Sequence, residues 1–135
     1  MFGNIQDYVT DGIIELKGVD LSFGKGRFIT IARAGGSNQA FKFYSANKFK
    51  SHNKEMKRGE LDEAVAEATM HDIYASKVVI GWKGWTGDNG KDIPFTVKNC
   101  IALFKASPEI YRIVYEESQN LDNFRKEEVA ESGNE

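Results

Sequence analysis

The residues that could perform chemistry are few in this chain and lie far apart. The 135 residues include one cysteine, Cys100, and two histidines, His52 and His71. Cys100 falls on the apolar face of a predicted helix, which favours a small buried hydrophobe over a nucleophile that must meet a substrate. The histidines fall in separate predicted helices, and no group of Cys and His has the spacing of a metal site. We therefore expect no catalytic residue, no metal, no cofactor and no enzymatic activity.

Two glycine-containing motifs are similar to ligand-binding loops, but each lacks a required part. Residues 23–28, FGKGRF, carry Gly-x-Gly ahead of a predicted strand. A phosphate-binding loop instead needs its glycines between a strand and a helix, so that the amides point at the anion. Residues 87–92, GDNGKD, offer oxygen ligands but lack the spacing and the bidentate glutamate of an EF-hand. Because Asn-Gly is also a common tight-turn pair, both motifs are predicted to be turns.

Positive charge and aromatic residues are concentrated together between residues 42 and 58. Such a segment could contact nucleic acid. However, acidic residues follow immediately, the net charge of the chain is −2, and no nucleic-acid-binding motif is present. A solvated helix with an aromatic core face is the favoured interpretation, and nucleic acid is disfavoured as a partner. The basic residues are Lys42, Lys48, Lys50, Lys54, Lys57 and Arg58.

Both tryptophans lie in one glycine-rich loop at residues 81–96, GWKGWTGDNGKDIPFT. Glycine lets the backbone turn sharply and approach other elements closely, and proline holds the residue before it in an extended shape. Trp82 follows the apolar run Val-Val-Ile-Gly, so we expect it to be buried between the second and third helices, with Trp85 more exposed. The residues to which we assign a structural role in the loop are Gly81, Trp82, Gly84, Pro94 and Phe95.

The elements that must position these residues indicate an α+β fold. Two β-rich runs, Ile13 to Leu16 and Phe28 to Ala32, predict a small N-terminal antiparallel β-hairpin or sheet. Since an isolated hairpin is only marginally stable, it must pack on helices, of which about four are predicted.

Capping residues mark where these helices begin. Ser37 or Asn38 caps the first, which follows two glycines. The second spans about residues 58–79 and carries acidic residues early, where the helix dipole favours them. Thr96 caps the third. Ser107 caps the last, with Pro108 in its first turn and a buried stripe that extends to Phe124.

Length and composition predict one compact domain over residues 1–126 and a polar, flexible tail over residues 127–135. One cysteine allows no intramolecular disulfide, which fits a reducing compartment. The start of the chain lacks the pattern of a signal peptide, and no run approaches eighteen apolar residues. We expect a protein of the cytoplasm that has no membrane partner.

Several blocks of this sequence, in order, resemble small tail proteins of long-tailed bacteriophages, the tail assembly chaperones. The resemblance covers about residues 28–124. It is carried by Arg-Ala-Gly-Gly-x-Asn at 33–38, Gly-Trp-x-Gly at 81–84, Asp-x-Gly-x-x-x-Pro-Phe at 88–95, and a final Asn-Phe at 123–124. The chain departs from the pattern in its second tryptophan, Trp85, and in its basic first helix.

The resemblance implies a non-catalytic function in the cytoplasm of a bacterial host. Such a chaperone coats the tape measure protein, helps to recruit tail tube subunits, and then leaves. This function needs an exposed apolar or aromatic groove and is helped by weak self-association, so we expect homo-oligomers. The candidate partner-binding residues are Trp85, Phe43, Lys48 and Lys50.

Two alternatives stay open, namely a structural virion component, such as a minor tail or connector subunit, and a nucleic-acid-binding regulator. Some chaperones of this kind also have a longer product made by ribosomal frameshifting. Ser-Gly-Asn at 132–134 permits a slippery heptamer in the gene, so we expect this region to be the junction.

Overall fold

The structure is a computed structural model that describes residues 1–126. The predicted flexible tail at 127–135 and its Ser-Gly-Asn tripeptide lie outside the described residues. Two N-terminal strands and a third strand at residues 79–83 form an antiparallel sheet that packs with helices, which confirms the α+β fold class. The elements in order are η1 (Gln6–Tyr8), α1 (Gly12–Lys17), β1 (Val19–Ser22), β2 (Phe28–Ile31), α2 (Gln39–Lys50), α3 (Asn53–Lys57), α4 (Glu63–Lys77), β3 (Val79–Lys83), α5 (Val97–Ala106), α6 (Pro108–Gln119) and η2 (Leu121–Phe124).

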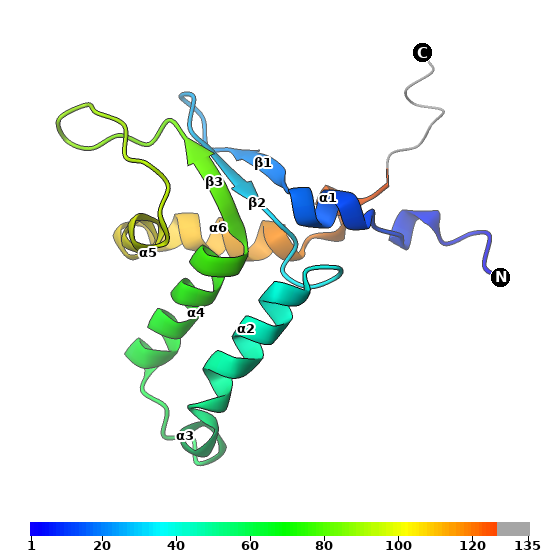
Figure 1. The fold of residues 1–135 in the computed structure, drawn as a ribbon, viewed down its shortest axis with the longest axis horizontal. Helices are drawn as coiled ribbons and strands as arrows, with labels where there is room; N and C mark the ends of the chain where they lie inside the picture. The colour runs from blue at the N-terminus through cyan, green and yellow to red at the C-terminus, as the bar shows by residue number, and fades with distance from the viewer. Residues whose placement is uncertain (127–135) are drawn as a thin grey trace.

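The sheet has the order β1-β2-β3, so β2 lies at its centre (Figure 1). Ile29 and Ile31 of β2 are completely buried, and they join a core cluster that includes Phe104, Val114 and Phe124. These five side chains come from β2, α5, α6 and η2. The core therefore joins the sheet to the C-terminal helices.

The first predicted strand is wrong, because Ile13 to Leu16 lie in helix α1. The Asp11 side chain caps this helix by accepting a hydrogen bond from the Ile13 amide at 2.8 Å. Gly18 ends the helix with φ of 89°, and β1 begins at the next residue. A six-residue helix is too short to show a helical period clearly, so its β-branched residues suggested a strand.

The third strand of the sheet, β3, was missed. Residues 78 and 79 were assigned to the end of the second helix, but α4 ends at Lys77. The chain then pairs antiparallel with β2, with Trp82 opposite Ile29. A continuous apolar run such as Val-Val-Ile fits a buried helix end and a strand equally well.

Both glycine-containing motifs are turns, as predicted. Residues 23–27 connect β1 to β2, with Lys25 at φ of 55° between two glycines that also have positive φ. At 87–92, Gly90 has φ of 76° and the Asn89 side chain accepts from the Lys91 amide at 2.9 Å. Backbone hydrogen bonds close each turn, from the Phe23 amide to the Arg27 carbonyl at 2.8 Å and from the Gly87 amide to the Lys91 carbonyl at 2.9 Å.

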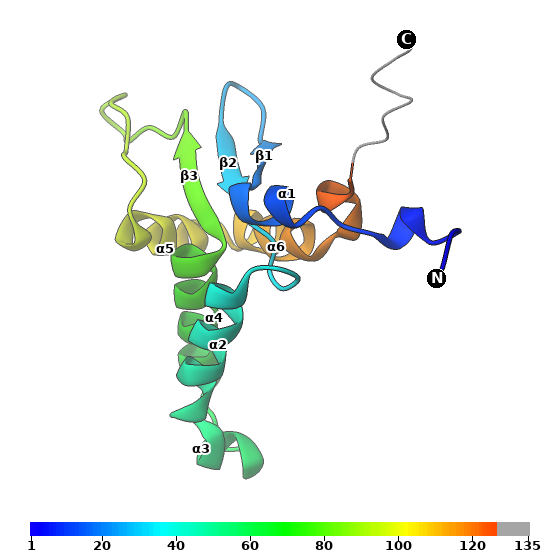
Figure 2. The ribbon, with the colours of Figure 1, turned by 45° about the vertical axis from the view of Figure 1, so that its right-hand side comes forward.

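The predicted helix caps at Asn38, Thr96 and Ser107 are confirmed. The Asn38 side chain also donates to the carbonyls of Arg33 and Lys77, at 2.8 Å and 2.9 Å. Asn38 therefore fixes the start of α2 against the end of α4. From there α2 and α4 run side by side, away from the sheet, and α3 closes their far end (Figures 1 and 2).

The last helix is shorter than predicted, because α6 ends at Gln119 and Leu121 begins the separate turn η2. Phe124 on that turn is completely buried. The predicted stripe therefore reaches the core, although it does so from two elements and not from one.

Candidate partner-binding groove

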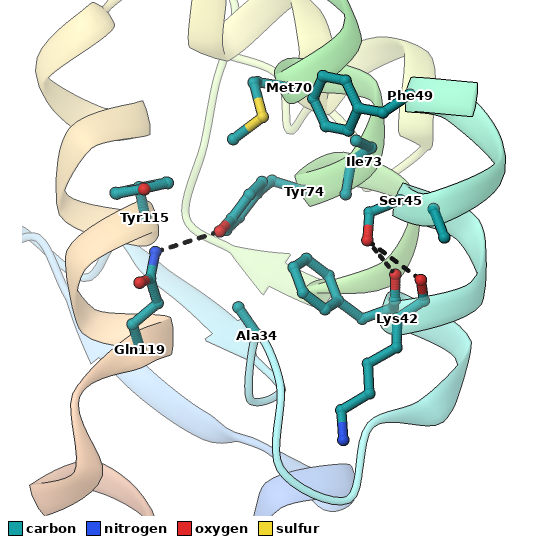
Figure 3. A pocket seen from close by; sticks show the side chains of 11 residues that line it. Ala34, Lys42, Ser45, Phe49, Met70, Ile73, Tyr74, Tyr115 and Gln119 are labelled. Atoms are coloured by element: carbon teal, nitrogen blue, oxygen red, sulfur yellow. Dashed lines mark hydrogen bonds between the residues drawn. The ribbon is translucent and has the colours of Figure 1, made fainter. Parts of the chain in front are cut away.

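An apolar groove lies where α2, α4 and α6 meet, and its volume is about 510 Å³ (Figure 3). Proteins hold small ligands in cavities of about 300–1,000 Å³. We refer to this feature as the groove. The residues that line it are Ala34, Phe41, Lys42, Ser45, Ala46, Phe49, Met70, Ile73, Tyr74, Tyr115 and Gln119.

The α2 wall of the groove is one helix face. Residues 41, 42, 45, 46 and 49 line it, and this spacing places them on one side of a helix. Helix α2 buries none of its twelve residues. Its apolar residues on this face are therefore only partly covered by the rest of the chain.

A polar network holds this wall at a fixed position beside α4. The Tyr44 hydroxyl donates to Asp72 at 3.0 Å, Ser76 donates at 2.9 Å, and the Lys48 ammonium lies 3.0 Å away. Burial by itself would raise the pKa of Asp72, but these partners outweigh it and hold the pKa below its ordinary value. Asp72, which lies on α4, is therefore ionised at neutral pH and holds Tyr44 and Lys48 of α2 against its own helix.

The floor of the groove is formed by Tyr74 of α4, which is only 3% exposed. Its ring meets Phe41 of α2 at 5.6 Å and Tyr115 of α6 at 5.4 Å, measured between ring centroids. Burial raises the pKa of the Tyr74 hydroxyl to about 12, so the hydroxyl stays neutral. One aromatic side chain thus contacts both walls.

The two ends of the groove differ in polarity. Phe49, Met70 and Ile73 gather at one end, whereas Lys42 and Gln119 lie toward the other (Figure 3). The groove can therefore take apolar side chains at the first end and an anionic or hydrogen-bonding group at the second. This arrangement suits binding through an amphipathic surface.

The predicted burial of the two tryptophans is wrong, because it is reversed. Trp85 is only 8% exposed and donates its indole N–H to the Phe28 carbonyl at 3.1 Å. Its ring meets Phe23 at 5.5 Å and lies under the Arg27 guanidinium. Trp82 lies in β3, and not between two helices, and its ring is partly exposed.

Gly84 explains the reversal. It has φ of 83°, and a Cβ at this position would collide with the Gly26 carbonyl. This close approach turns the chain after β3, so that Trp85 packs beneath the β1–β2 turn. Trp82 is left on the outer part of the strand, where it donates to the Ile93 carbonyl at 2.8 Å and contacts Phe95 at 5.4 Å.

Two other loop residues that were assigned a structural role have backbone contacts. Gly81 pairs with Thr30 in the sheet. The Pro94 carbonyl accepts from the Asn99 side chain at 3.0 Å, which joins the end of the loop to the start of α5.

Three of the four candidate partner-binding residues lie on α2, and Trp85 lies apart from them, after β3. Trp85 is buried against the sheet, which contradicts the exposure predicted for it. Lys48 pairs with Asp72, whereas Phe43 is 68% exposed and Lys50 is also exposed. Among the described residues, the lining of the groove includes none of the four.

Sequence reasoning missed the groove residues Ala46, Met70, Tyr115 and Gln119. The spacing of 41, 45 and 49 on one helix face was a usable signal. What the sequence did not indicate is that α6 leaves this face uncovered.

The basic segment is partly neutralised by acidic side chains. Besides the pair of Lys48 with Asp72, the Arg58 guanidinium lies 3.5 Å from Glu60. Two of the six basic residues at 42–58 thus have a carboxylate partner, which weakens the case for a phosphate-binding surface.

Of the three residues named at the outset, Cys100 and His71 are buried, whereas His52 is only partly covered. Cys100 is completely buried, and burial raises the pKa of its thiol to about 12, which confirms a small buried hydrophobe. His71 is 3% exposed and packs on Tyr111, with 4.6 Å between ring centroids. Within residues 1–126, no cluster of three or more His, Cys, Asp or Glu side chains could hold a metal ion. No helix in that range is long and apolar enough to cross a membrane.

Comparison with known proteins gives one match. The family model described as YdaY prophage protein matches residues 36–134, which is most of the chain. No curated protein and no solved structure matches it. The match supports a phage origin, as expected from the sequence, but does not identify a tail assembly chaperone. The chain belongs to the YdaY prophage protein family, and it is therefore a phage- or prophage-encoded protein.

Proposed function

We propose that this protein is a phage tail assembly chaperone that holds a helical segment of the tape measure protein in the groove. The groove is the observation that carries the proposal. It has two helical walls, an aromatic floor and about 510 Å³ of space. Amphipathic helices bind in such grooves through apolar side chains three and four residues apart. The prophage family supports the setting in which such a client occurs.

The difference between the two ends of the groove suggests how the client lies. Apolar side chains of the client would fill the end formed by Phe49, Met70 and Ile73. A carboxylate or amide of the client would meet Lys42 and Gln119 at the other end. The site is open, so binding is modest and reversible, as a chaperone that leaves the finished tail requires.

The proposal includes recruitment of tail tube subunits and action in the host cytoplasm. Both follow from the resemblance to tail assembly chaperones. Recruitment is tested separately, by whether the tube protein joins a purified complex of this chain with its client.

Co-purification from cells that express the full chain and the tape measure protein of the same prophage tests the proposal. The tape measure protein should be retained by the wild type and lost with Ala46→Glu, which places a carboxylate on the exposed part of the α2 wall. Burying that charge under a client disfavours binding. We therefore expect the variant to retain at least about tenfold less tape measure protein than the wild type does. Ala40→Glu is the matched control, since Ala40 is an exposed alanine of α2 that does not line the groove.

Two other outcomes would replace this function. If the protein is found in purified phage particles at stoichiometric amounts, it is a structural virion component. If it retards DNA or RNA in a gel with a steep salt dependence, it is a nucleic-acid-binding regulator that uses the segment at 42–58.

A further inference from the structure

The first eight residues form an arm in which every residue is exposed. We use "the arm" for residues 1–8, MFGNIQDY. Phe2 is 70% exposed, Tyr8 is 74% exposed, and Ile5 is 40% exposed. The arm leads away from the body of the protein (Figures 1 and 2). The chain is attached to the body only after the arm, where the Asp11 amide donates to the Phe124 carbonyl at 2.8 Å.

Large apolar side chains gathered on an exposed segment indicate an interaction site. The same chain carries a groove of about 510 Å³ with an apolar lining. We propose that the arm of one copy docks in the groove of a second copy. This inference concerns the chain alone and does not rest on the proposed client.

The arm has the spacing that the groove requires. Phe2, Ile5 and Tyr8 are three residues apart, and the arm already contains the 3₁₀ turn Gln6–Tyr8. Side chains at i and i+3 lie on one side of such a turn. Ile5, which precedes the turn, and Tyr8, which ends it, have this spacing, and Phe2 lies three residues before Ile5, outside the turn. The arm thus offers large apolar side chains to the end of the groove where apolar groups gather.

Charge complementarity also favours a copy of this chain as the occupant. Residues 1–16 contain Asp7, Asp11 and Glu15 but no Lys or Arg, so the α-amino group of Met1 is the one positive charge of this segment. Helix α2 contains Lys42, Lys48 and Lys50 but no Asp or Glu. Glu15 is buried within its own chain, so Asp7, on the arm, is the carboxylate placed to meet Lys42 at the rim of the groove.

The arm and the groove are different surfaces, so the contact is heterologous. Each copy offers one arm and one groove, and each copy added leaves a free arm at one end and a free groove at the other. Such contacts extend into open chains unless the rotation between copies closes a ring. A short arm makes a small interface, so the association is weak and depends on concentration.

This inference is tested with two variants. Each variant lacks one of the two surfaces that form the contact. The arm variant carries Phe2→Ser, Ile5→Ser and Tyr8→Ser, and the groove variant carries Ala46→Glu. All four positions are exposed, so both variants should fold, and thermal melts check that they do. Sedimentation velocity across a concentration series measures the mass of each protein alone and of an equimolar mixture.

The wild type should form oligomers that grow with concentration. Each variant alone should stay monomeric, with a dissociation constant raised at least about tenfold. The mixture should form a heterodimer and nothing larger, because the arm variant supplies only a groove and the groove variant supplies only an arm. Two controls should associate like the wild type, namely Ala40→Glu and the double variant Ile13→Ser with Leu16→Ser, whose exposed apolar side chains lie on α1.

Three results would overturn the inference. A mixture that stays monomeric would show that arm and groove do not bind each other. An arm variant that still associates would place the contact on another surface. A wild type that is monomeric at every concentration would exclude a second copy as the occupant of the groove. This holds even if the chain is monomeric because the arm binds the groove of its own chain. None of these results would exclude the proposed client.

Discussion

Gln119 on α6 donates its side-chain amide to the hydroxyl of Tyr74 on α4, at a distance of 3.3 Å. This bond joins the α6 wall of the groove to its floor (Figure 3). On the other side, the Tyr74 ring meets Phe41 of α2. A single buried tyrosine therefore fixes the spacing of both walls, and the groove is part of the packed structure of the protein.

The hydroxyl and the ring of Tyr74 can be separated by mutation. Tyr74→Phe removes one hydrogen bond and keeps the ring, so it should lower the free energy of unfolding by about 0.5–1.5 kcal/mol. Tyr74→Ala also removes a buried aromatic ring and should cost about 3–5 kcal/mol. Urea denaturation followed by circular dichroism measures both. Equal losses for the two variants would show that the ring does not support the groove.

The two tryptophans should differ in their effect on stability. Trp85→Ala removes a buried ring and its hydrogen bond to Phe28, and should cost about 3–5 kcal/mol. Trp82→Ala should cost clearly less, because its ring is partly exposed. The free energy of unfolding of each variant decides the matter, and a greater loss for Trp82→Ala would contradict the burial described here.

The turn after β3 should depend on the absence of a side chain at Gly84. Gly84→Ala faces both a positive φ of 83° and a collision with the Gly26 carbonyl. Gly24→Ala is a matched control, since it has φ of 78° but nothing within 4 Å of the added Cβ. The control should cost about 1–2 kcal/mol, and Gly84→Ala should cost more. Equal melting temperatures for the two variants would show that the close approach has no energetic role.

These contacts explain why the sequence indicated some features and not others. Asn38, Thr96 and Ser107 were identified as caps because a cap depends on the few residues that follow it. The exposure of Trp82 and Trp85 depends on where Gly84 meets Gly26, which are 58 positions apart. Local patterns carry no information on such a contact.

The groove could be predicted in part. Its α2 face follows from helical spacing, and a partner-binding groove was expected from the resemblance to tail assembly chaperones. Its position depends on three helices, and on a bond between residues 74 and 119. Trp85 was chosen because it was expected to be exposed, and the fold buries it against the sheet. Phe43, Lys48 and Lys50 lie on α2, outside the lining of the groove.

Stability should fall at acidic pH because of His71. Burial lowers the pKa of His71 below its ordinary value of 6.5, and nearby Glu67 on α4 and Lys105 on α5 act in opposite directions. Its other neighbours are the rings of Phe104 on α5 and Tyr111 on α6. The unfolded chain therefore binds a proton more readily than the folded chain does. The contribution of neutral His71 to the free energy of unfolding is complete above pH 6.5 and is lost as the pH falls below that value.

Urea denaturation at several values between about pH 8 and pH 5 measures this effect as the free energy of unfolding at each pH. One histidine can change that free energy by at most about 1.4 kcal/mol per pH unit. His71→Phe keeps a ring but cannot titrate, so it should flatten the slope in this range. His52→Gln is the control and should keep the slope, because His52 lies at the start of α3, outside this packing. An unchanged slope in His71→Phe would assign the pH dependence to other groups.

Client and arm should compete if both use the groove. A peptide with the sequence of the client helix should dissociate the oligomers of the wild type, and sedimentation velocity would detect the loss of mass. Oligomers that persist when the peptide is bound would show that client and arm use separate surfaces.

The most direct test of the central claim is site-specific photo-crosslinking in cells in which the prophage is induced. A photoreactive phenylalanine analogue at position 46 lies on the α2 wall of the groove, and the same analogue at position 40 lies on α2 outside it. The account predicts crosslinks from position 46 to a helical segment of the tape measure protein, and few or none from position 40. Equal crosslinking at both positions, or no tape measure protein in the adducts from position 46, would contradict it.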